Sequence, residues 1–304
     1  MAKLPTCFVI GNCTHRPIQA YLSATGLFSE VESMALFTVK KEGFGEAFER
    51  VKTYDYVFSI AHGAIWGPFE AANLKSVFGK RAATFATPFF TGLHPDLIYA
   101  ANGQARVQSA LLGDYHSGLV FWGFMTGQPV EEIIEMYHGA ELPPLFALET
   151  AWQDAITELH ARDRHVDIPS APVFDRVCRE KPAMLTFNHP SMDIIAALCR
   201  AFCARLFGED VPAWADYGNI YHHLTSDVRI PVMPAALRAY QLPYLSLPTY
   251  KCRPKPHAKD VYLRFDDFAR LSYQDYAAQP RGRLTAATPT GLAARLNAAI
   301  GQAL

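Results

Sequence analysis

The chain has 304 residues, of which 50% are hydrophobic and 12% aromatic, so it can bury one large core or two ordinary ones. Its 28 basic and 29 acidic residues give a formal net charge of −1, which argues against nucleic acid as a partner. The N-terminus lacks the pattern of a secretory signal, and no apolar segment approaches the ~20 residues of a membrane-spanning helix. We therefore expect a cytoplasmic protein without a membrane span.

The N-terminal part of the chain alternates between runs typical of strands and runs typical of helices. Strands are expected at Cys7–Ile10, Ser33–Val39, Tyr54–Ala61 and Ala82–Thr87, and helices at Pro17–Thr25, Phe44–Lys52 and Phe69–Phe78. Strands and helices that alternate at this spacing predict right-handed βαβ units and a parallel sheet. The third strand has the clearest signal, because it is dense in β-branched and aromatic residues.

Beyond this part the pattern becomes mostly helical. Helices are expected at Gly118–Met125, Val130–Tyr137, Phe146–Arg162, Ser191–Leu206, Asp260–Arg270 and Thr290–Leu304, with one short strand at Ala183–Phe187. The segment Asp167–Pro172 is the best candidate for a linker, and the proline-rich segment Arg229–Lys259 for an irregular loop. We predict a helix-rich α/β fold: residues 1–165 form a Rossmann-like three-layer core, and residues 166–304 form a mostly helical part packed on it.

The polar turn after the first strand, Gly11-Asn12-Cys13, is the strongest candidate for a reactive site. Ligands of open α/β sheets bind at the carboxyl ends of strands, where this turn is expected. A helix follows from Thr14, and the partial positive charge of a helix N-terminus favours the thiolate form of a nearby cysteine. A structural, half-buried cysteine is the alternative. Cys199 and Cys203 fit the core face of a helix better than a metal site.

A catalytic cysteine needs a partner base, and four histidines lie in polar, glycine or proline loops. They are His62, His94, His116 and His189. His62 and His94 follow the third and fourth strands, so both should share a sheet edge with Cys13. The alternative for each is a histidine that only satisfies backbone groups at a strand end. The absence of HExxH, Walker, GxSxG and GxGxxG motifs argues against zinc and dinucleotide sites.

Four short motifs recur in this order and at about this spacing in a known family: Gly11-Asn12-Cys13, Phe90-Thr91-Gly92-Leu93-His94-Pro95-Asp96, Tyr115-His116-Ser117 and Asn188-His189-Pro190. In these motifs the chain resembles the WcbI-type capsular polysaccharide biosynthesis proteins, over most of its length. The resemblance implies O-acetylation of capsule sugars and binding of coenzyme A. A more distant likeness to SGNH hydrolases and acetyltransferases places Gly-Asn-Cys where those proteins have Gly-Asp-Ser.

On this resemblance we expect acetyl transfer from acetyl-CoA to a sugar hydroxyl, with the Cys13 thiolate as the group that carries the acetyl. Direct transfer, with Cys13 only lining the site, is the alternative route. For the base we rank His94 first, oriented by Asp96, then His62 and then His116. The SGNH proteins carry a late Asp-x-x-His, whereas His94-Pro95-Asp96 lies early in this chain. Candidate donors to the oxyanion, each typically worth ~3 kcal/mol, include the Asn12 side chain.

The helix start at Thr14, His15 and Arg16 is expected to meet a phosphate of coenzyme A through backbone N–H groups and the guanidinium. Gly11, Asn12 and His189 complete the residues expected around this cofactor, and no metal is expected. Two other functions stay open. One is a cysteine-dependent esterase or thioesterase, in which water replaces the sugar. The other is a non-catalytic protein of capsule assembly that binds coenzyme A or a sugar.

Overall fold

The computed structural model describes residues 3–139, 142–208, 212, 214, 216–253, 259–279, 284–287 and 291–303. The chain divides into two compact units, each built from three separate segments. Unit 1 contains Met1–Phe89, Ile156–Cys178 and Asn188–Ser226, and unit 2 contains Phe90–Ala155, Arg179–Phe187 and Asp227–Leu304. Both units therefore include residues from either side of the boundary predicted between residues 165 and 166.

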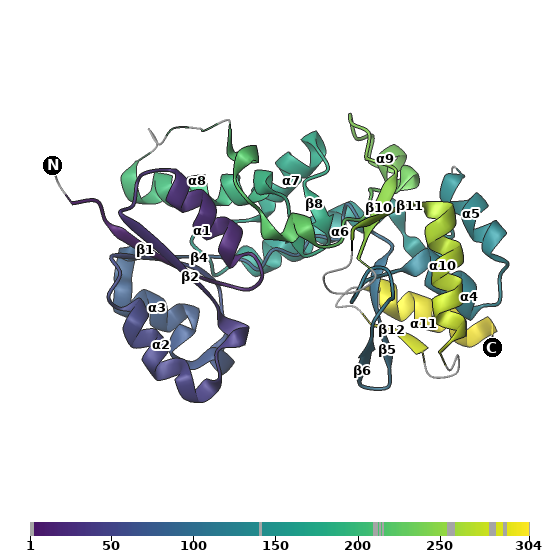
Figure 1. Ribbon diagram of the computed structural model, residues 1–304, viewed down its shortest axis with the longest axis horizontal. Coiled ribbons are helices and arrows are strands. Elements are labelled where there is room, and N and C mark those ends of the chain that lie inside the picture. Colours follow the sequence, from purple (N-terminus) through teal and green to yellow (C-terminus); the bar gives the residue numbers. More distant parts are fainter. Residues whose placement is uncertain are drawn as a thin grey trace. The chain divides into compact units, whose positions relative to one another are not determined.

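Unit 1 is organised around a parallel four-stranded sheet with the strand order β2-β1-β3-β4. The strands are β1 (Thr6–Gly11), β2 (Glu30–Ala35), β3 (Tyr56–Ile60) and β4 (Ala82–Phe85). Helices α1 (His15–Ala24) and α8 (Met192–Phe207) cover one face of the sheet, and α2 (Phe44–Val51) and α3 (Ala71–Phe78) cover the other (Figure 1). This three-layer arrangement confirms the predicted fold class.

The central strand β1 packs against both layers of helices. Phe8 and Ile10 lie in a hydrophobic core with residues of α2 and α3. On the other side of the sheet, Phe58 of β3 stacks on Phe202 of α8, with ring centroids 4.4 Å apart. Because helices cover both faces, residues 7–11 of β1 are all buried, which explains why this strand is an uninterrupted apolar run.

Two local predictions in unit 1 are tested by this packing. The second strand spans Glu30–Ala35 rather than Ser33–Val39, because its extent is set by pairing with β1 from Thr6 to Gly11. It is an edge strand, so its glutamates are tolerated. Cys199 and Cys203 of α8 are fully buried, as predicted, and burial raises the pKa of the Cys203 thiol to about 12.

The segment predicted to be a linker, Asp167–Pro172, is instead part of unit 1. The backbone N–H groups of Asp167 and Ile168 donate to the carbonyl of Thr84 at 2.9 and 3.0 Å, beside β4. The Asp167 carboxylate accepts two more hydrogen bonds, from the backbone N–H and the hydroxyl of Thr84, both at 2.9 Å. Helix α7 (Ala171–Glu180) then begins inside the segment. The prediction of a linker was wrong. Prolines and a serine are typical of linkers, but here the segment first pairs beside β4 and then begins a helix.

We expect Asp167→Ala to lower the free energy of unfolding by about 2–3 kcal/mol. The substitution removes the acceptor of two hydrogen bonds from the fully buried Thr84, and it also removes the ionic partner of Lys75 and Arg205. Denaturant unfolding measures the change. Glu49→Ala, which removes only an exposed ion pair with Lys52, is the control and should change stability little. Equal losses in the two variants would contradict this account.

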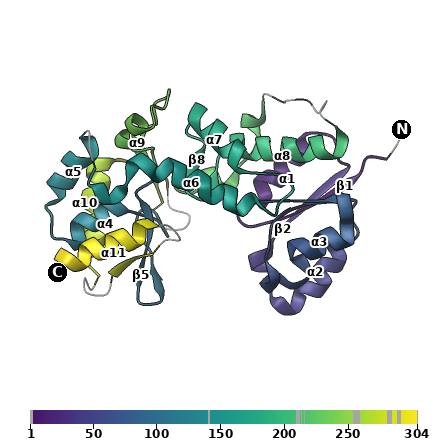
Figure 2. The same ribbon diagram turned by 180° about the vertical axis from the view of Figure 1, so that it is seen from behind.

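Unit 2 combines an antiparallel sheet with a cluster of helices. In the sheet, β5 (Leu97–Asn102) pairs with β6 (Ala105–Val107), β7 (His116–Ser117) and β12 (Leu284–Ala287). The cluster contains α4 (Gly118–Met125), α5 (Val130–His138), α10 (Phe265–Ala277) and α11 (Gly291–Ala303) (Figure 2). This sheet was not predicted, because β5 and β12 lie far apart in the sequence and pair only through tertiary contacts.

The other α-helices and β-strands of the described residues are α6 (Leu148–Asp163), β8 (Met184–Thr186), β9 (His189–Pro190), α9 (Pro234–Ala239), β10 (Thr249–Cys252) and β11 (Val261–Arg264). The proline-rich segment thus contains a helix and a strand, although its residues 254–258 lie outside the described part. Helix α10 begins at Phe265, later than predicted, because the residues before it pair with β10. Across the described residues, no helix has both the length and the apolar character needed to cross a lipid bilayer.

Candidate functional site

Cys13 lies in the turn between β1 and α1, at the carboxyl end of the central strand. Asn12 shapes this turn, because its Oδ1 accepts hydrogen bonds from the backbone N–H and the hydroxyl of Thr14 at 3.0 and 2.9 Å. The Asn12 backbone carbonyl accepts a further bond from the N–H of His15 at 3.1 Å. These bonds fix the half-buried Cys13 two residues before the helix begins.

The same hydrogen bonds change what the helix start can offer a ligand. The N–H groups of Thr14 and His15 are already paired within the turn, so they are poor candidates for a phosphate. The exposed Arg16 is left as the candidate cation there. Conversely, the two bonds into Asn12 Oδ1 fix the orientation of its planar amide and direct Nδ2 to the opposite side. Asn12 Nδ2 takes no part in these two hydrogen bonds and is a candidate donor to a ligand.

His15 anchors the start of α1 to the edge strand β2. Its Nδ1 lies 2.8 Å from the hydroxyl of Ser33. That hydroxyl donates to Gln19 Oε1 at 2.5 Å, and Gln19 Nε2 donates to the carbonyl of Val31 at 2.9 Å. Because the single hydroxyl hydrogen of Ser33 goes to Gln19, Ser33 accepts from His15, and the His15 proton lies on Nδ1.

This relay holds the His15 ring at the start of α1, and its expected contact with a phosphate stays a prediction. Burial, followed by the charges of Arg16 and His223, lowers the pKa of His15 to about 4, so the ring is neutral at pH 7. Gly11 lies directly against it, since a Cβ at Gly11 would come within 3.4 Å of the His15 Cβ. Ser33 and Gln19 were not predicted at this site, because no local sequence pattern pairs them with His15.

His62 lies at the same edge of the sheet as Cys13. In the pairing of β1 with β3, Ile10 is opposite Ser59, and Cys13 and His62 each follow this pair by three residues. Among the described residues, the buried Nε2 atom of His62 has no hydrogen-bond partner. Burial lowers the pKa of His62 to about 4, so its ring is neutral at pH 7.

His94 and Asp96 lie in unit 2 and are 1% and 5% exposed. His94 Nε2 lies 3.3 Å from the carbonyl of Met184. The Asp96 carboxylate accepts from the hydroxyl of Ser117 at 2.7 Å, and its backbone carbonyl accepts from the N–H of Gly118 at 2.5 Å. Gly118 is required there, because a Cβ would lie 2.6 Å from that carbonyl oxygen. Asp96 thus organises the start of α4.

His116 is also buried in unit 2, with both ring nitrogens engaged. Nδ1 lies 2.9 Å from the hydroxyl of Tyr276, and Nε2 lies 3.0 Å from the carbonyl of Val107. Of the three histidines ranked as the base, His62 alone belongs to the same unit as Cys13. His116 has a partner for both ring nitrogens, whereas His94 Nδ1 and His62 Nε2 are buried without one among the described residues. The ranking of the base stays a prediction, and the proposal below uses His62 because the strand register places it at the edge of Cys13.

His189 lies in unit 1, in β9, and is 8% exposed. The neighbouring carbonyl of Pro190 accepts a hydrogen bond from His222 Nε2 at 2.9 Å. His222 and His223 follow one another in the sequence, with ring centroids 6.3 Å apart. Within the described part of the chain, no group of three or more histidine, cysteine, aspartate or glutamate side chains is placed to hold a metal ion.

Acidification from pH 6.5 to about 4 is expected to destabilise the protein. Burial lowers the pKa of His15, His62 and His94 from 6.5 to about 4, so in this window the unfolded chain binds protons that the folded protein does not. Stability therefore falls as the pH falls. Burial raises the pKa of Asp96 from 3.8 to about 6, so the folded protein binds one proton there that the unfolded chain does not. This single proton opposes the loss of stability. Calorimetric Tm values measured across the window check this, and a Tm that rises on acidification would contradict it.

Comparisons with known proteins agree with this fold. The family described as "Polysaccharide biosynthesis enzyme WcbI" matches residues 6–208. A solved structure of WcbI, a polysaccharide biosynthesis enzyme, aligns over 99% of this chain and 100% of that chain, with a TM-score of 0.68 and 14% sequence identity. That structure is of a native protein without a disulfide bond between coenzyme A and one of its cysteines. At this identity the likeness shows the fold alone.

A comparison with curated proteins found no match. The family match includes the Cys13 turn, the sheet of unit 1 and helix α8. It covers more than half of the chain, and the alignment with the solved structure extends over nearly all of it. The chain therefore belongs to the WcbI family of polysaccharide biosynthesis enzymes.

Proposed function

We propose that this protein is an O-acetyltransferase that moves an acetyl group from acetyl-CoA to a sugar hydroxyl in capsular polysaccharide biosynthesis. The observation that carries the proposal is the matched placement of Cys13 and His62 at the carboxyl edge of the parallel sheet. Membership of the family supports a sugar substrate, and the coenzyme A named for the solved WcbI structure supports the donor. The cytoplasmic location remains a prediction from the sequence.

The residues at this edge suit the thioester end of coenzyme A. Cys13 is half-buried at the start of α1, where the helix dipole favours the thiolate. Asn12 Nδ2 and the backbone N–H of Cys13 are the donors that we assign to the oxyanion, and such a donor is typically worth ~3 kcal/mol. Arg16 is exposed beside them and carries the charge that a phosphate needs.

In the first half of the reaction, His62 Nε2 takes the proton of the Cys13 thiol. The thiolate attacks the acetyl carbonyl carbon, the bond from this carbon to the donor sulfur breaks, and His62 returns the proton to that sulfur. One thioester replaces another, so the step is close to isoenergetic. In the second half, His62 takes the proton of the sugar hydroxyl while its oxygen attacks the acetyl group on Cys13. An ester forms, the bond to Cys13 breaks, and His62 returns the proton to the thiol.

Two measurements test the function. Coenzyme A at a hundred times its Kd should stabilise the protein by about 2.7 kcal/mol, visible as a rise in Tm. Release of coenzyme A from acetyl-CoA beyond one equivalent per protein should require a sugar acceptor. Release that never requires the sugar would favour an esterase or thioesterase. A flat Tm together with no turnover would contradict both enzymes and favour a non-catalytic protein of capsule assembly.

A further inference from the structure

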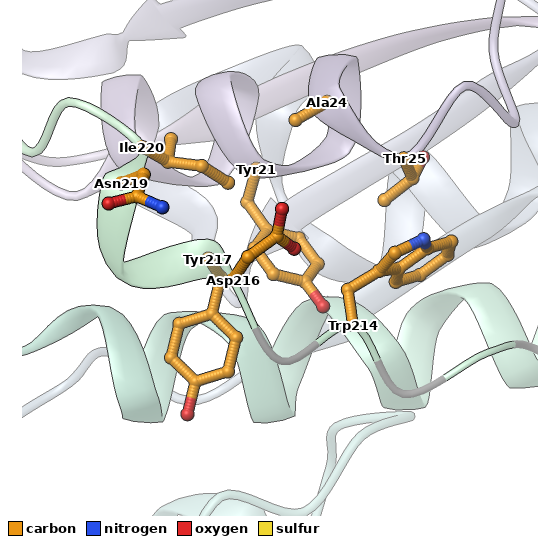
Figure 3. A pocket seen from close by; sticks show the side chains of 8 residues that line it. All are labelled: Tyr21, Ala24, Thr25, Trp214, Asp216, Tyr217, Asn219 and Ile220. Carbon is orange, nitrogen blue, oxygen red and sulfur yellow. The ribbon is translucent and has the colours of Figure 1, made fainter.

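An open pocket lies beside the C-terminal end of α1 in unit 1 (Figure 3). It has a volume of about 220 Å³ and is lined by Tyr21, Ala24, Thr25, Trp214, Asp216, Tyr217, Asn219 and Ile220. One wall comes from the end of α1, and the other comes from the irregular segment that contains the 3-10 helix Tyr217–Asn219. None of these residues takes part in the acetyl transfer proposed above.

Aromatic rings form the inner surface of the pocket. Tyr21 is 3% exposed, and its ring lies 6.4 Å from the Trp214 ring at an interplanar angle of 82°. It lies 6.4 Å from the Tyr217 ring at 58°. The Tyr217 hydroxyl donates to Asp193 at 2.9 Å, which fixes this ring. Neither neighbouring ring is parallel to that of Tyr21, so a planar base cannot stack between Tyr21 and either of them, whereas tilted rings suit the C–H faces of a puckered ring.

Polar groups lie at the rim. Figure 3 shows the carboxylate of Asp216 between the side chains of Asn219 and Trp214. Asp216 and Asn219 are both exposed, so a carboxylate acceptor and an amide donor are available to neighbouring hydroxyls of a ligand. Among the lining residues Asp216 carries the only charge. A negative rim opposes a phosphorylated ligand such as a nucleotide and favours a neutral polyol.

We propose that this pocket binds a neutral sugar residue of the acceptor. The sugar ring packs on Tyr21 and Trp214, and its hydroxyls bond to Asp216 and Asn219. Tyr21 lies six residues after His15 on α1, which is about 9 Å further along the helix from the Cys13 turn. A sugar residue held there is therefore adjacent to the sugar residue that receives the acetyl group. The proposal rests on the proposed function and extends it, since it makes the acceptor a saccharide of more than one sugar residue.

Saturation-transfer NMR with the methyl glycosides of glucose, galactose and mannose tests the pocket. We expect transfer to at least one of them, and Trp214→Ala and Asp216→Ala should each weaken its binding by about tenfold or more. Tyr221→Ala is the matched control, because Tyr221 is 74% exposed in the same segment and does not line the pocket. Circular dichroism confirms that each variant is folded. Asp216→Ala changes an exposed side chain, so it keeps the test valid if Trp214→Ala fails to fold.

The pocket proposal is overturned if no glycoside binds, or if Tyr221→Ala weakens binding as much as Trp214→Ala does. It is also overturned if adenosine 3′,5′-bisphosphate binds and Trp214→Ala abolishes that binding, which would make this a nucleotide pocket. The rise in Tm caused by coenzyme A should be unchanged in both pocket variants. A protein that binds glycosides in the pocket but shows no coenzyme A effect would contradict the proposed function and leave the sugar site standing.

Discussion

Replacing Cys13 by alanine is expected to lower the rate of acetyl transfer by roughly 10³-fold or more, because the variant lacks the thiol that carries the acetyl group in the covalent route. The initial rate of coenzyme A release in the presence of a sugar acceptor measures the loss. Intact-protein mass spectrometry adds a direct observation. Wild-type protein mixed with acetyl-CoA should gain one acetyl group on Cys13, and Cys13→Ala should gain none.

Cys13→Ser is the matched variant, since it keeps the shape of the side chain but replaces the thiol by a hydroxyl that is not ionised at neutral pH. We expect it to be nearly as slow as Cys13→Ala. Both variants should keep the rise in Tm caused by coenzyme A, which separates loss of chemistry from loss of binding. If Cys13→Ala retains near-normal transfer, the acetyl group passes directly to the sugar and Cys13 only lines the site.

Replacing His62 by glutamine is expected to lower kcat by about 10²–10⁴-fold, the range typical for removal of a general base. The amide of glutamine can occupy the buried position but cannot accept the proton of a thiol or a sugar hydroxyl. A pH profile gives a second signature. Because burial lowers the pKa of His62 to about 4, kcat/KM should show no decline near pH 6.5, where an ordinary histidine base would become protonated.

His94→Gln is the comparison for this experiment. His94 is 1% exposed and contacts the carbonyl of Met184, so we expect this variant to lose stability but to keep its rate per folded molecule. The opposite result, normal kcat in His62→Gln and a lost kcat in a folded His94→Gln, would restore the ranking expected from the sequence. Ser33→Ala should have a smaller effect than His62→Gln, because Ser33 acts only through His15.

Several parts of the fold could be predicted from the sequence, because their signals are local. The apolar run, the polar turn and the helix start around Cys13 are read from a few consecutive residues. Helix α4 begins and ends as predicted at Gly118 and Met125, since Ser117 caps it by accepting from the N–H of Val120. The alternation of strands and helices predicted the parallel sheet and so the edge where Cys13 lies.

Other features depend on contacts between residues that are distant in the sequence. Asp167 looked like part of a linker until its pairing with Thr84 placed it beside β4. A histidine in a polar loop gives the same local signal whether both ring nitrogens find partners, as in His116, or one buried nitrogen has none among the described residues, as in His62. The pocket likewise exists only because Tyr21 and Trp214 meet. The sequence by itself determined the polar turn and the parallel sheet, whereas tertiary packing decided which histidine nitrogens are buried and which have partners, because burial and hydrogen-bond partners belong to the folded chain.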